Sequence, residues 1–80
     1  MKLYRIRITS GPNAGRYVGP NIGGLVTNKE LLANREVKVP GTKYSLYVQE
    51  GAANKYFENP AACVQAELKA KGYESELVEA

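Results

Sequence analysis

Residues 59–72, NPAACVQAELKAKG, decide the fold, because this stretch predicts a complete helix with both ends marked. Asn59 is expected to cap the first turn and Pro60 to take the first helical position. Gly72 suits the residue just past the end, where Tyr73 can fold back on the helix. Its apolar residues recur at helical spacing and predict an inward stripe made of Ala61, Val64 and Leu68.

The segments around this helix alternate in the way of half-buried strands. Residues 2–9 place apolar side chains on one side and basic ones on the other, and residues 43–49 place Tyr44, Leu46 and Val48 on one side. Residues 73–78 predict a closing strand. If residues 43–49 and 73–78 ran parallel in one sheet, the helix between them would be a right-handed crossover.

Glycine and proline predict the turns between these strands. Gly11–Gly15 reads as a hairpin loop, with left-handed geometry expected at Asn13 and Gly15, and residues 16–18 form the return strand. Residues 19–23, GPNIG, repeat this turn. Pro40-Gly41 predicts a type II turn between residues 36–39 and 43–49.

A capping box starting at Thr27 predicts a two-turn helix over residues 27–33. The expected fold is α+β, with residues 1–80 as a single domain. We expect a mainly antiparallel sheet of about four to five short strands, with the longer C-terminal helix packed on one face.

Several functional classes are disfavoured by composition. The 80 residues contain no His and no Asp, which removes the commonest general base and metal ligand, so we expect no enzyme, metal or cofactor. The glycine loops match no phosphate-binding motif. Cys63 is the one cysteine and is expected to be a small buried side chain. No signal or membrane-spanning stretch is present, which predicts a cytoplasmic protein without a membrane partner.

Charge is distributed unevenly along the chain. Residues 1–48 carry eight Lys or Arg and two Glu, a net charge of +6, whereas residues 49–80 carry three Lys and six Glu, a net charge of −3. Such a dipole would steer one side of the molecule toward an acidic partner.

We therefore expect a macromolecular partner. The candidate binding residues are basic or aromatic and lie on or beside predicted strands: Arg5, Arg7, Arg16, Tyr17, Lys38, Lys43 and Tyr47. They could form an RNA- or single-strand-binding sheet face, or a protein-binding surface in which Tyr and Arg act as anchors. We favour the protein partner because no nucleic-acid motif is present. An exposed strand edge leaves monomer and homodimer both open.

Residues 47–78 resemble one βαβ half of a SPOR domain, through Tyr47-Val48-Gln49-Glu50-Gly51, Phe57 and Leu68-Lys69-Ala70-Lys71-Gly72-Tyr73. The resemblance implies a local fold. In size and plainness the chain is also similar to small phage-encoded inhibitor proteins, which implies a role in blocking the surface of another protein.

Overall fold

A computed structural model describes residues 1–20 and 35–80, which form one sheet and one α-helix. The elements in chain order are β1 (Tyr4–Ile8), β2 (Tyr17–Pro20), β3 (Arg35–Lys38), β4 (Tyr44–Tyr47), α2 (Glu58–Ala70) and β5 (Ser75–Glu79). Two short 3₁₀ turns, Gly11–Asn13 and Glu50–Ala52, lie in the connections. The strand order is β3-β4-β2-β1-β5, and every neighbouring pair is antiparallel.

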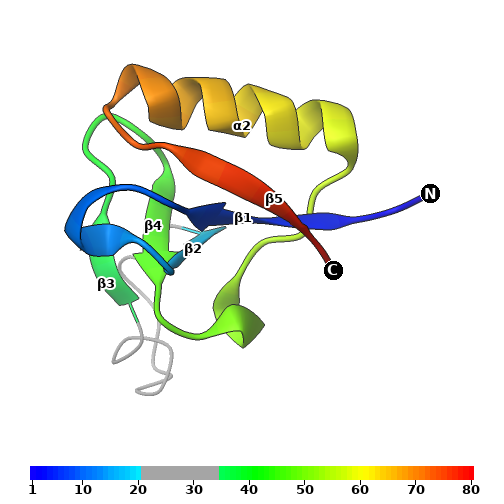
Figure 1. The fold of residues 1–80 in the computed structure, drawn as a ribbon, viewed down its shortest axis with the longest axis horizontal. Helices are drawn as coiled ribbons and strands as arrows, with labels where there is room; N and C mark the ends of the chain where they lie inside the picture. Colours follow the sequence, from blue (N-terminus) through cyan, green and yellow to red (C-terminus); the bar gives the residue numbers. More distant parts are fainter. Residues whose placement is uncertain (21–34) are drawn as a thin grey trace.

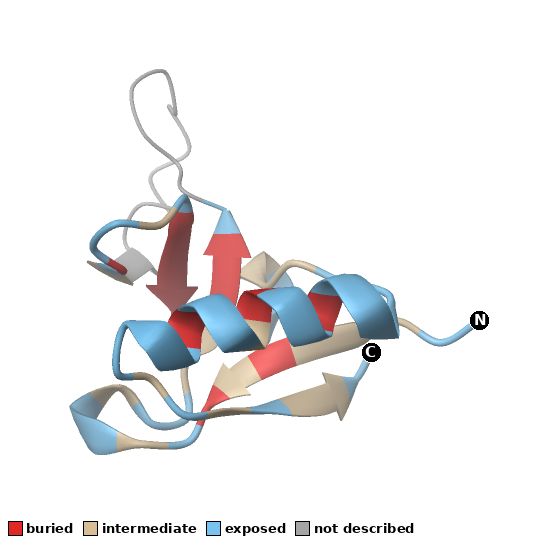
Figure 2. Ribbon diagram, turned by 90° about the horizontal axis from the view of Figure 1, so that it is seen from above, coloured by how far each residue is buried: buried red, intermediate tan, exposed pale blue. Residues whose placement is uncertain are grey.

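The α+β class and the antiparallel sheet are confirmed, and α2 covers one face of the sheet over β1 and β5 (Figure 1). Figure 2 shows buried residues both on α2 and on the strands of the sheet. The core consists of Ile6, Ile8, Val18, Val39, Tyr44, Leu46, Ala61, Val64 and Leu68. The predicted helix stripe is therefore confirmed in full.

The C-terminal end of α2 confirms the predicted glycine stop. Gly72 has a φ of 90°, its N–H donates to the Lys69 carbonyl, and the Tyr73 N–H donates to the Leu68 carbonyl at 3.0 Å. This pair of bonds is the Schellman motif, and Tyr73 packs against the core beside it.

The N-terminal end of α2 differs from the prediction. The helix begins at Glu58 with Phe57 in the capping position, so Asn59 lies in the first turn and is not the cap. The Ala61 N–H makes the first backbone bond, to the Phe57 carbonyl. Pro60 is tolerated one position before Ala61 because the N–H groups of a first turn have no partner within the helix.

Both predicted hairpins are present, with one change in the first turn. Positive φ angles fall on Gly11 and Gly15 and not on Asn13, which lies within the 3₁₀ turn Gly11–Asn13. At the second turn Gly41 has a φ of 77°, and the Thr42 N–H donates to the Val39 carbonyl, so the type II turn is confirmed.

Other expectations need correction. Gly19 and Pro20 belong to β2 and form no turn, and Cys63 is exposed on α2, since the inward stripe of the helix is filled by other residues. Val48 is half exposed because β4 ends at Tyr47. β4 and β5 run antiparallel with β2 and β1 between them, so α2 is not a parallel crossover.

The predicted two-turn helix at 27–33 and the rest of the second glycine turn lie outside the described residues. Among the residues that are described, no helix has the length and apolar character needed to cross a membrane.

Replacing Gly72 by Ala tests the helix stop. A φ of 90° strains any residue with a Cβ, although open space surrounds the position, so we expect Gly72→Ala to lower the free energy of unfolding by about 1 to 2 kcal/mol in urea. Gly51→Ala is the control, because Gly51 also borders open space but has no positive φ. Equal losses in the two variants would contradict this account of the helix end.

Candidate binding surfaces

Most of the residues predicted to bind lie on the sheet face opposite α2, which we call the open face. Arg7 is opposite Tyr17 in the ladder and Tyr17 is opposite Tyr47, so the three share this face with Arg5. Lys38, opposite Ser45, joins them at the β3 end. Arg16 and Lys43 precede β2 and β4 and lie outside this row. The structure therefore brings together five of the seven predicted residues.

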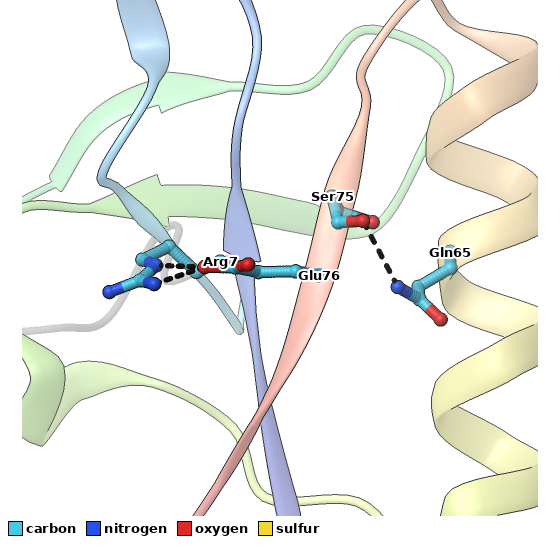
Figure 3. A network of polar contacts seen from close by, with 4 residues as sticks. All are labelled: Arg7, Gln65, Ser75 and Glu76. Atoms are coloured by element: carbon cyan, nitrogen blue, oxygen red, sulfur yellow. Dashed lines mark hydrogen bonds and ion pairs between the residues drawn. The ribbon is translucent and has the colours of Figure 1, made fainter.

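The basic side chains of β1 are paired with carboxylates. Arg7 donates to Glu76 on the neighbouring strand, with Nε at 2.7 Å from Oε1 (Figure 3). This bond to Glu76, followed by contacts with Tyr17, raises the pKa of Arg7. Lys2 lies 3.7 Å from Glu79. Two carboxylates of the C-terminal strand thus lie beside Arg7 of β1 and beside Lys2 just before it, although these residues are far apart in the sequence.

The 3₁₀ turn at Glu50–Ala52 covers part of the open face. Arg5 Nη1 lies 2.7 Å from the Glu50 carboxylate, and only 18% of the Arg5 side chain is exposed. Tyr47 is completely buried, and its hydroxyl donates to the Pro20 carbonyl. Its ring lies so close over Gly19 that a Cβ there would be 2.5 Å from it. Tyr47 therefore packs within the fold and offers no face for stacking.

A second surface lies at the N-terminal end of β1, beside the start of α2. Here Phe57 and Tyr4 line a hollow whose other walls are Met1, Lys2 and Glu58. Phe57 is 48% exposed and is one of the exposed large apolar side chains in the described residues, with Met1 and Val48. The sequence analysis did not select Phe57. The sequence signal for an exposed Phe57 was its position directly before the start of a helix, where the chain turns away from the core.

The segment before Phe57 fixes the position of this hollow. The Asn54 N–H donates to the Val18 carbonyl of β2, while Tyr56 forms a two-bond bridge with Tyr4 of β1. These residues therefore bond to both strands where the strands separate. Tyr56 packs against the core and its hydroxyl accepts from Asn54 Nδ2 at 2.8 Å. Tyr56 thus anchors the segment, and Phe57 follows on the outside.

A third surface is formed by lysines around the β3–β4 turn. Lys71, just past the end of α2, places Nζ 2.8 Å from where a Cβ on Gly41 would be. Lys43 follows the same turn and lies over the Tyr44 ring at 5.7 Å, and Lys38 enters the turn from β3. No carboxylate pairs with these three lysines in the part of the chain that the structure describes.

Comparison of the chain with protein-family models, with curated proteins and with solved structures finds no match. The resemblance of residues 47–78 to half of a SPOR domain therefore stays a prediction.

Tyr56, in the segment before Phe57, makes the stability of the fold depend on pH. Burial raises the pKa of Tyr56, so the unfolded chain loses this proton before the folded protein does. The folded state is therefore fully stabilised below about pH 10, the ordinary pKa of tyrosine, and loses stability as the pH rises further. Tyr56→Phe removes this proton, so its free energy of unfolding should fall less than that of the wild type between about pH 9 and about pH 11. An unchanged pH profile in urea melts would contradict the assignment.

Proposed function

We propose that this protein is a non-enzymatic protein-binding module that uses the hollow around Phe57 as its contact surface. The carrying observation is the half-exposed Phe57 ring, set beside Tyr4 by a segment that is bonded to two strands. Aromatic side chains held in a fixed position lose little entropy on binding and are common anchors at protein interfaces.

The charges around the hollow suit a protein better than a polyanion. Lys2 and Glu58 carry opposite charges on its walls, and Lys2 also reaches Glu79. A phosphate backbone requires a run of cations without acidic neighbours. A protein surface with an apolar centre and mixed charges at its rim would be complementary to this hollow.

The open face offers little to nucleic acid. Arg5 and Arg7 are paired with Glu50 and Glu76, and Tyr47 is buried. A phosphate would have to displace a carboxylate from each arginine. Covering a partner's surface also needs no catalytic group, so the inhibitor role expected from the sequence is one form of this proposal.

Nucleic-acid binding is the second candidate, and it rests on the lysines at the β3–β4 turn. Lys38 and Lys43 are exposed, and Lys71 lies against the same turn. This group could hold phosphates without the paired arginines of the open face. Affinity for a nucleic acid grows with the number of phosphates that the protein neutralises. Three lysines are fewer cations than tight binding requires.

Phe57→Ser tests the protein-binding proposal against a matched control. Val48 is 51% exposed and lies outside the hollow, so Val48→Ser removes a similar apolar area from another place. Chemical crosslinking in cell lysate, quantified by mass spectrometry, should give protein adducts with wild type and Val48→Ser. The yield with Phe57→Ser should fall about tenfold, as expected for an anchor worth about 1.4 kcal/mol.

Two results would contradict the proposal. One is an equal yield with Phe57→Ser and wild type. The other is a set of crosslinks to RNA or DNA that disappears when Lys43 and Lys71 are replaced by Gln, which would favour the second candidate.

A further inference from the structure

The two edges of the sheet are protected to different degrees. At β3 the ladder is interrupted by a bulge between Arg35 and Val37, and Lys38 and Pro40 follow. Bulges, lysines and prolines are the usual means by which an edge strand avoids pairing with another chain. β5 has five consecutive ladder pairs with β1 and contains no bulge, lysine or proline. β5 is therefore the edge suited to further pairing.

The backbone of β5 presents unsatisfied groups on its outer side. The Glu74 carbonyl and the Ala80 N–H bond to β1, and backbone direction alternates along a strand. Ser75, Leu77 and Glu79 therefore direct their N–H and C=O groups away from β1. In the described part of the chain one contact reaches them, a long 3.4 Å bond from Gln65 Nε2 to the Ser75 carbonyl (Figure 3).

The acidic residues of β5 do not prevent close approach by a second acidic strand. Glu76 is paired with Arg7 and Glu79 with Lys2, so cations of the same chain offset both charges. Glu74 and Lys69 line the same hollow between β5 and α2. Two of the three acidic residues at this edge are thus offset by ion pairs within the chain.

We propose that β5 pairs antiparallel with β5 of a second copy of this chain, centred on Leu77. This register brings the outward groups of the two strands together and places Ser75 opposite the partner's Glu79. It places Glu76 opposite the partner's Val78. Sliding one strand by two residues would put Glu76 opposite the partner's Glu76, which is unfavourable because like charges directly opposite each other repel.

The remaining side chains and the helix are compatible with this pairing. Leu77 is opposite Ile6 in the ladder and packs against the core, so the centred register continues an apolar row across both chains. In Figure 2 the strand that ends at C lies beyond the helix, at the border of the sheet. Ala66, which lines the hollow between α2 and β5, is small and leaves room beside the edge.

The dimer should be weak, because a single five-residue strand pair buries much less surface than a standard interface. Sedimentation velocity of the wild type from about 10 µM to about 1 mM should show a concentration-dependent shift from monomer to dimer. The surface differs from the hollow around Phe57, so Phe57→Ser should dimerise like the wild type. Failure of one proposal therefore leaves the other intact.

Two matched pairs of variants test the edge and the register. Glu79→Pro removes an outward N–H while leaving the β1 ladder bonds, and should abolish dimerisation, whereas Glu79→Ala, which loses the same ion pair, should keep it. Val78→Glu places a carboxylate opposite the partner's Glu76 twice in each dimer. Its dissociation constant should rise roughly two- to thirtyfold compared with Val78→Thr.

A wild type that stays monomeric over the whole concentration range would overturn the proposal. So would dimerisation of Glu79→Pro at the wild-type strength, because the outer edge of β5 would then have no part in it. Equal dissociation constants for Val78→Glu and Val78→Thr would overturn the register centred on Leu77.

Discussion

The antiparallel pairing of β1 with β5 is the contact on which the rest of the structure depends. It joins the first and last strands over five residue pairs, which puts β1 inside the sheet and leaves β5 at its border. α2 ends just before β5 and packs over both strands, so the same pairing fixes the helix on the sheet. It also brings the acidic end of the chain onto its basic beginning, where Glu76 meets Arg7 and Glu79 meets Lys2.

This pairing supports the proposal that binding uses the ends of the sheet and not its centre. The open face has basic residues in its sequence, but Glu50 and Glu76 satisfy Arg5 and Arg7 within the chain. Tyr47 fills the space above Gly19 and so closes the face further. Groups not used in this way remain at the hollow around Phe57 and at the lysines of the β3–β4 turn. In the proposed function, the charges of the sheet are satisfied within the chain and its rim makes the contact with a partner.

Local chemistry predicted most of the fold, because its signals lie within a few residues of each other. The Gly72 stop, the Pro40-Gly41 turn and the helix stripe each depend on such short-range patterns. The candidate binding residues were harder to predict, since the exposure of each side chain depends on contacts between distant positions. Arg7 looked like a free cation because its partner, Glu76, is 69 residues away. Phe57 was not among the predicted binding residues, because its exposure is decided by where the segment before it crosses β1 and β2.

Titration of the labelled protein with single-stranded RNA, followed by amide shifts in NMR at low salt, tests the central claim most directly. If ion pairs with Glu50 and Glu76 neutralise the arginines of β1, the wild type should show no salt-sensitive shifts at Arg5 and Arg7, while a Glu50→Gln, Glu76→Gln double variant should gain them. Shifts at both arginines in the wild type would contradict the account, because they would show that the ion pairs leave these side chains available to phosphate.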